Sequence, residues 1–142
     1  MNLRPLLLAG LASVFISSAA LADIRHIVSF KYKPGVSAEV KADIARRFIA
    51  LKDEAQRDGA PYIVSIAGGA AISREGFDQG LEQAFIVTFK NTGDRDYFVG
   101  KPYREAMDPH HQALAEQVTP LLAADASGKP TGLFVFDFDD GR

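Results

Sequence analysis

The side chains best suited to chemistry in this chain are its three histidines and the tyrosines near them. His26 lies early in the chain, and His110 and His111 are adjacent, directly after Asp108 and a proline. An imidazole titrates close to neutral pH, so it can accept or donate a proton. The chain has no cysteine, which excludes thiol nucleophiles and disulfides. These residues favour acid–base or hydrogen-bonding chemistry at an imidazole.

The segment around the adjacent histidines predicts a helix. Asp108 is a suitable N-cap, and a proline follows it at the first helical position. His111 shares helical spacing with Leu114 and Val118, so it is expected to point inward, and His110 outward. The helix dipole lowers the pKa of a histidine in the first turn and favours its neutral form. His111 is therefore either a packing residue or a general base in a pocket.

His26 lies on the apolar face of an alternating segment, residues 24–33, which predicts a strand. It is either a core histidine hydrogen-bonded across the fold or a ligand-binding group in a pocket. Tyr97, Phe98 and Tyr103 are either packing residues or the aromatic wall of a ligand cavity, because ligand pockets are mainly apolar with a few polar groups.

The sequence predicts neither a metal site nor a bound cofactor. Adjacent histidines on a helix are a poor chelating pair, and no cysteine is available as a further ligand. The pair Gly68-Gly69 is not followed by the Gly-Lys-Ser/Thr of a phosphate loop. No basic patch accompanies the net charge of −2, so nucleic acid is not an expected partner.

Residues 1–22 have the order of a secretory signal peptide. Arg4 precedes an apolar run at 6–16, and Ala20-Leu21-Ala22 offers a small-x-small cleavage site. The apolar run is well short of the roughly 20 residues that cross a bilayer. We therefore expect export to a bacterial periplasm or secretion, no stable membrane anchor after cleavage, and one mature domain at residues 23–142.

The elements of the mature chain alternate in a simple order. Ser37 is a suitable N-cap for a first helix, whose apolar stripe runs from Val40 to Ala55. The pair Gly68-Gly69 predicts a bend or bulge after the second strand. The expected strands are 24–33, 62–67, 83–90 and 132–138, with helices after Ser37, over 94–99 and after Asp108. The order β-α-β-β-α-β predicts an α+β fold with a ferredoxin-like, four-stranded antiparallel sheet.

The last strand is apolar on both of its faces. Phe134, Phe136 and Phe138 alternate with Leu133 and Val135. Because the helices of such a fold cover one face of the sheet, the other face is left apolar and open, which a monomer rarely tolerates. A second sheet stacked about 10 Å away would cover it, so we expect a homodimer.

The chain resembles the stress-responsive α/β-barrel family, also called the dimeric α/β-barrel family, over residues 24–139. The stretches that carry the resemblance are Arg25-His26-Ile27-Val28-Ser29-Phe30-Lys31-Tyr32-Lys33, Gly68-Gly69, Asp108-Pro109-His110-His111-Gln112 and Leu133-Phe134-Val135-Phe136-Asp137-Phe138. The resemblance implies a dimer in which two sheets close a barrel.

The resemblance also implies a place for acid–base groups. A plant polyketide cyclase of this family uses a histidine of a His-Pro-x-His stretch and a nearby tyrosine, and the matching histidine here is His111. Tyr103 and Tyr97 are both candidates for the tyrosine. This chain departs from the pattern at Asp108, which replaces the first histidine of the stretch.

Two functions are compatible with these residues. The first is an exported module that binds a small apolar or aromatic molecule, or protects under stress. The second is an enzyme of the lyase, cyclase or monooxygenase type that needs no cofactor and uses His111 as its general base. A cavity that holds His111 and a tyrosine hydroxyl would favour the second function.

Overall fold

The computed structural model describes residues 23–141, and the predicted signal peptide lies outside the described residues. The order along the chain is β1 (Ile24–Phe30), α1 (Ala38–Glu54), β2 (Gln56–Arg57), β3 (Ala60–Pro61), β4 (Ile63–Ala70), β5 (Gln83–Phe89), α2 (Thr92–Val99), α3 (Pro109–Val118), a 3-10 turn (Thr119–Leu121) and β6 (Leu133–Asp139). The predicted order of the long elements is confirmed, and β2 and β3 add a small hairpin after α1.

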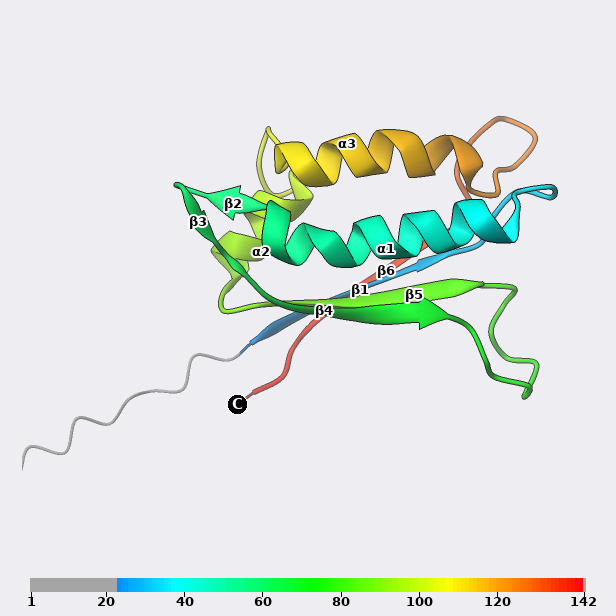
Figure 1. The fold of residues 1–142 in the computed structure, drawn as a ribbon, viewed down its shortest axis with the longest axis horizontal. Helices are drawn as coiled ribbons and strands as arrows, with labels where there is room; N and C mark the ends of the chain where they lie inside the picture. The colour runs from blue at the N-terminus through cyan, green and yellow to red at the C-terminus, as the bar shows by residue number, and fades with distance from the viewer. Residues whose placement is uncertain (1–22, 142) are drawn as a thin grey trace, which may run out of the picture.

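Four strands form one antiparallel sheet in the order β4-β5-β1-β6. Helices α1 and α3 lie side by side on one face of this sheet (Figure 1). The arrangement is the predicted α+β, ferredoxin-like fold, a two-layer structure with its core between helices and sheet. None of the helices within residues 23–141 combines the length and apolar character that crossing a bilayer requires.

Helix α1 forms where the sequence predicts it. The Ser37 hydroxyl accepts a hydrogen bond from the Val40 amide at 3.3 Å and caps the first turn. Ile44, Phe48 and Leu51 lie on its buried stripe. Phe48 stacks on Phe85 of β5, with ring centroids 4.3 Å apart, so an aromatic pair joins the helix to the sheet.

The prediction of a bend or bulge at the glycine pair is wrong. The irregularity of β4 falls between Ile63 and Ser65, and Gly68 continues the strand opposite Phe85. A Cβ atom at Gly68 would lie 2.3 Å from the Ala84 carbonyl oxygen, closer than any side chain allows. Glycine is required there because β5 approaches the backbone closely.

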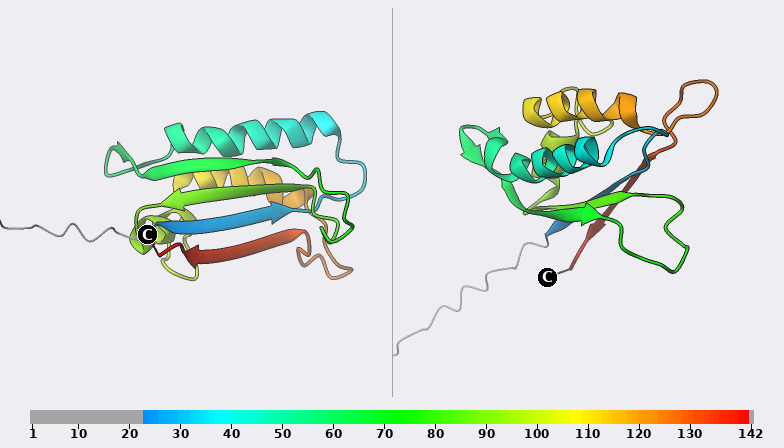
Figure 2. Two further views of the ribbon diagram at one scale, coloured as in Figure 1. Left: turned by 90° about the horizontal axis from the view of Figure 1, so that it is seen from below. Right: turned by 45° about the vertical axis from the view of Figure 1, so that its right-hand side comes forward.

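The face of the sheet opposite the helices is apolar and open. Ile27 of β1 pairs with Ile86 of β5 on one side and Phe136 of β6 on the other, which places the three side chains in one row. Ile86 is 41% exposed and Phe136 is 54% exposed. In the part of the chain that the structure describes, no helix covers this face (Figure 2).

Candidate functional site

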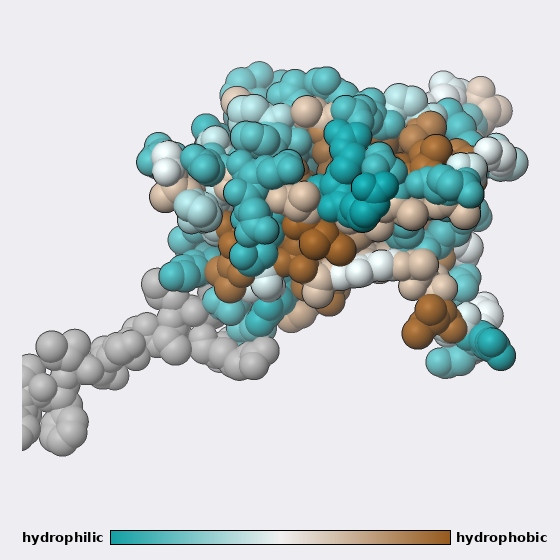
Figure 3. Space-filling model, in the orientation of Figure 1, coloured by the Kyte–Doolittle hydropathy of each residue, from teal (hydrophilic) through white to brown (hydrophobic). Residues whose placement is uncertain are grey.

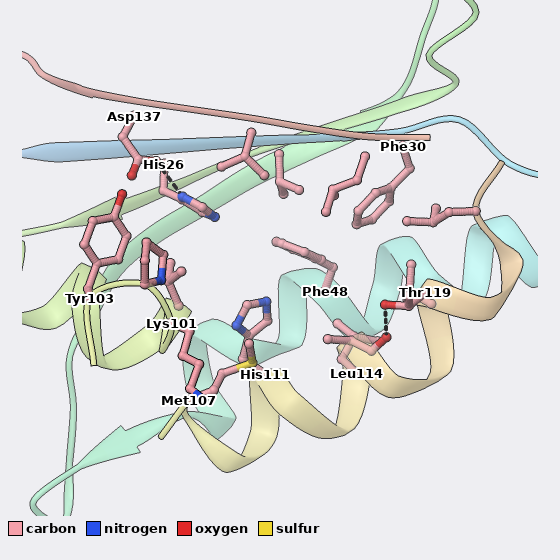
Figure 4. Close-up of a pocket in the computed structure, with 18 residues that line it drawn as sticks. His26, Phe30, Phe48, Lys101, Tyr103, Met107, His111, Leu114, Thr119 and Asp137 are labelled. Atoms are coloured by element: carbon pink, nitrogen blue, oxygen red, sulfur yellow. Dashed lines mark hydrogen bonds and ion pairs between the residues drawn. The ribbon is translucent and has the colours of Figure 1, made fainter. Parts of the chain in front are cut away.

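A cavity of about 430 Å³ lies between α3 and the helix-facing side of β1 and β6 (Figure 4). Most of its wall is apolar, contributed by Val28, Phe30, Phe48, Leu114, Val118 and Val135. The polar side chains that also line it are His26, Lys101, Tyr103, His111, Thr119 and Asp137. An apolar cavity with a few converging polar groups is the usual form of a small-molecule site.

His111 is held in one tautomer. Its Nδ1 atom is 2.8 Å from the Phe98 carbonyl oxygen, and because a carbonyl only accepts, Nδ1 carries the proton. The imidazole stacks on the Phe98 ring, with centroids 3.9 Å apart. Burial lowers the pKa of His111 from 6.5 to about 4. The ring is therefore neutral at pH 7, and its Nε2 atom keeps a lone pair able to accept a proton.

Asp108 fixes the start of α3 and thereby the position of the His111 imidazole. The carboxylate is fully buried and caps α3, accepting hydrogen bonds from the amides of His110 at 2.8 Å and His111 at 3.1 Å. Its second oxygen accepts from the Tyr62 hydroxyl at 2.9 Å. The predicted cap is confirmed. The side chain of His110 is 52% exposed, as the helical spacing predicts.

His26 has both of the roles that the sequence left open for it, a hydrogen bond across the fold and a place in the pocket. Its Nδ1 atom is 2.6 Å from Oδ1 of Asp137 on β6, so it is hydrogen-bonded across the sheet. It also lines the cavity, and Figure 4 shows its ring extending from β1 into that space. Burial lowers the pKa of His26, and the Asp137 carboxylate opposes that shift in part. The ring is neutral at pH 7, and its Nδ1–H donates a hydrogen bond to the Asp137 carboxylate.

Arg95 links the His26–Asp137 pair to Tyr103. Its guanidinium donates to the second oxygen of Asp137 and to Asp96, and it lies 3.9 Å from the centre of the Tyr103 ring. The hydroxyl of Tyr103 points toward the end of the cavity where His26 and Asp137 lie (Figure 4). Tyr103 and His111 therefore line one cavity, and Arg95 holds Tyr103 by a cation–π contact.

Tyr97 and Phe98 are not among the residues that line this cavity. Tyr97 instead packs edge-to-face on Tyr62 and donates to the Gln56 carbonyl at 3.3 Å. Phe98 is fully buried beneath His111 and contributes its ring and its carbonyl to that residue. Val99 is the residue of α2 that lines the cavity instead. Neighbouring side chains of a helix diverge by about 100° around its axis, so Tyr97 and Phe98 face other neighbours.

Arg95 and Asp137 are the site residues that sequence reasoning missed. Asp137 follows Leu133 and Val135 at a spacing of two residues, so the alternation of side chains along a strand places its carboxylate on the cavity side of β6. Nothing in the local pattern marks Arg95, because its partners come from other elements. Within residues 23–141, no three His, Asp or Glu side chains are grouped as metal ligands.

Comparison with known proteins identifies the family. The model of the stress responsive A/B barrel domain matches residues 24–140. The chain belongs to this family. No curated protein matches the A/B barrel domain described here.

Solved structures share the fold of this A/B barrel domain. A hydroxynitrile lyase from Passiflora edulis is 19% identical with a TM-score of 0.62, over 84% of this chain and 94% of that one. A protein from Arabidopsis thaliana is 19% identical with a TM-score of 0.61, over 82% and 93%. A dimeric ferredoxin-like protein of unknown function from Jannaschia sp. is 16% identical with a TM-score of 0.60, over 82% and 98%. At these identities the likeness establishes the fold.

Proposed function

We propose that this A/B barrel domain binds a small, mainly apolar or aromatic molecule that carries one acidic hydroxyl group. The observation that carries the proposal is the neutral His111, whose Nδ1–H donates a hydrogen bond to the Phe98 carbonyl inside a mainly apolar cavity. The apolar walls supply affinity through burial of ligand surface. The free Nε2 atom accepts the hydroxyl proton of the ligand in a hydrogen bond and so fixes its orientation.

We expect 2-naphthol, an aromatic molecule with one acidic hydroxyl, to bind once per chain. The His111→Ala variant is expected to bind it about 3- to 10-fold more weakly, the usual value of one hydrogen bond. Fluorescence titration of the wild type and the variant measures this ratio. His110→Ala is the matched control and should leave the affinity unchanged, because His110 faces solvent.

A second variant places the binding in this cavity rather than on the open sheet face. Val135 lines the cavity at the edge strand and is 49% exposed, so Val135→Trp has room to enter the cavity without displacing the core. We expect this variant to lose 2-naphthol binding. If both Val135→Trp and His111→Ala bind 2-naphthol as the wild type does, the molecule does not bind in this cavity and the proposal is wrong.

A second candidate function is proton transfer without a cofactor, of the lyase or cyclase type. The neutral, buried Nε2 atom of His111 is suited to a general base, and a structural neighbour is a hydroxynitrile lyase. Mandelonitrile is the corresponding probe. Nε2 would take its hydroxyl proton, the carbon–cyanide bond would break as the carbonyl forms, and the leaving cyanide would take that proton. Benzaldehyde released by the wild type and not by His111→Ala would assign catalysis to the cavity.

We also propose that the protein is a homodimer built through the open sheet face. The row of Ile27, Ile86 and Phe136 supports this proposal, since stacking a second copy removes it from water. Similar solved structures are described as dimeric, which gives further support.

Finally, we propose that the domain is exported after removal of residues 1–22. The support is the order of Arg4, the apolar run at 6–16 and Ala20-Leu21-Ala22 in the sequence. Intact-mass analysis of the protein from its host is expected to show a chain that begins at Asp23. A mature chain that retains the apolar run would contradict this prediction.

A further inference from the structure

The connection between β4 and β5 is a long arm rather than a tight turn. It comprises residues 71–82, which separate Ala70 at the end of β4 from Gln83 at the start of β5. Hairpin loops usually contain about two to five residues. Figures 1 and 2 show the arm descending from the end of the sheet on the side away from α1 and α3. The arm therefore projects on the same side as the open apolar face.

Hydrogen bonds fix the base and the bend of this arm. The Ala71 amide donates to the Glu82 carbonyl at 2.8 Å, and the Glu82 amide donates to the Phe30 carbonyl at 2.7 Å. The Glu82 carboxylate also pairs with Lys41 of α1. Nearer the tip, Asp78 accepts from the amides of Gly80 at 2.8 Å and Leu81 at 2.9 Å. The arm thus has a defined direction relative to the sheet.

The arm carries the two most exposed large apolar side chains among those described. Ile72 is 91% exposed and Phe77 is 80% exposed. Figure 3 shows a hydrophobic group at the arm, which stands apart from the body of the protein. A fixed arm that holds an isoleucine and a phenylalanine in water gains free energy when a partner surface covers them.

The charge of the arm decides between two kinds of partner. Glu75, Asp78 and Glu82 give it three carboxylates against one guanidinium, Arg74. An anionic membrane surface repels such a segment, since membrane-binding segments are typically basic. The apolar row of Ile27, Ile86 and Phe136 lies on the same side of the sheet as the arm, so a second copy stacked on that row comes within reach of it.

We propose that the arm at residues 71–82 is a clasp for a second copy of this chain. Ile72 and Phe77 of one copy pack against the apolar surface of the other, and the two-fold symmetry of a homodimer repeats the contact. The clasp extends the interface beyond the stacked sheets. This inference rests on the homodimer proposed above, and the experiment separates the two.

Cross-linking tests the contact directly. A photoreactive benzoylphenylalanine replaces Phe77, and the purified protein is irradiated at micromolar concentration. We expect a covalent product of twice the monomer mass. The same residue placed at Lys129 is the control and should give no such product, because the loop at 122–132 lies on the helix side of the sheet (Figure 1). A Phe77 derivative that cross-links no second copy in a proven dimer would overturn the clasp.

Substitution measures how much the contact contributes. The double variant Ile72→Ser, Phe77→Ser is expected to raise the dissociation constant of the dimer by at least about tenfold, because both copies lose two buried apolar side chains. Arg74→Ser on the same arm is the matched control and should leave it unchanged. Analytical ultracentrifugation over a dilution series measures the constant, and circular dichroism confirms that each variant is folded.

The outcomes distinguish the clasp from the sheet interface. If Phe136→Asp dissociates the dimer and the double variant leaves the dissociation constant unchanged, the homodimer proposal stands and the clasp is overturned. A wild type that is monomeric at all concentrations overturns both. Binding of the wild type to vesicles of anionic phospholipid, lost in the double variant, would also overturn the clasp by assigning the arm to a membrane.

Discussion

The Phe136→Asp variant is expected to be a monomer at micromolar concentration, where the wild type is expected to be a dimer. Phe136 is 54% exposed on the open face of β6, opposite Ile27. In a two-fold interface each substitution occurs twice. Losing a buried phenylalanine costs about 1.5–3 kcal/mol, and a buried unpaired carboxylate costs several more. We expect the dissociation constant to rise on the order of 10³-fold or more, since each 1.4 kcal/mol is tenfold.

Light scattering after size exclusion measures this result as the molar mass of the eluting species. Ile49→Asp is the matched control, because Ile49 is also apolar and is 40% exposed, but lies on α1 on the helix side. It should remain dimeric. A Phe136→Asp protein that is folded and still dimeric would show that two copies associate through another surface.

The stability of the protein is expected to fall by about 3 kcal/mol between pH 6.5 and pH 4 because of His111 alone. Burial lowers the pKa of this imidazole from 6.5 to about 4 in the folded chain. Between these values the unfolded chain binds a proton that the folded chain does not, so the free energy of unfolding rises with pH. The contribution is complete above pH 6.5 and is lost as the pH falls toward 4.

Urea unfolding at pH 7 and pH 4.5, at one protein concentration, measures this dependence. His111→Phe keeps an aromatic ring against Phe98 but has no proton to bind, so its stability should depend less steeply on pH. His26, whose pKa burial also lowers, remains in both proteins, so His111→Phe should keep part of the pH dependence. His110→Ala is the control and should keep the full slope. Equal slopes in the wild type and His111→Phe would contradict the burial of a neutral His111.

The pH dependence and the proposed ligand binding rest on one structural arrangement at the cavity. His111 is neutral because burial lowers its pKa, and the hydrogen bond from its Nδ1 to a backbone carbonyl fixes its tautomer. His26 is neutral, and its Nδ1–H donates a hydrogen bond to the Asp137 carboxylate, which Arg95 also contacts. Two imidazoles in one cavity are thus poised as acceptors at neutral pH. A ligand that brings its own acidic proton can donate it in a hydrogen bond to such an acceptor.

The local elements of this protein could be predicted from its sequence because short-range rules decide them. Alternation of apolar residues marks three of the four main strands, and the Asp-Pro pair marks the start of α3. The helical spacing of His111 with Leu114 and Val118 correctly places the imidazole inward and His110 outward. Two-sided apolar character in β6 indicates the open face that the structure shows.

Contacts between distant segments were decided only by the tertiary structure. The Asp137–His26 pair joins residues that are 111 positions apart, and Arg95 reaches Asp137 across 42 positions. The choice of Tyr103 over Tyr97 as the cavity residue depends on how the segment between α2 and α3 returns over the sheet. The close approach of β5 to Gly68 likewise has no local signal. Periodicity determines which way a side chain faces, whereas the packing of elements determines which residues it contacts. The sequence therefore determined the fold and the inward orientation of His111. The cavity around His111 and the partners of its polar groups were decided only by the tertiary structure.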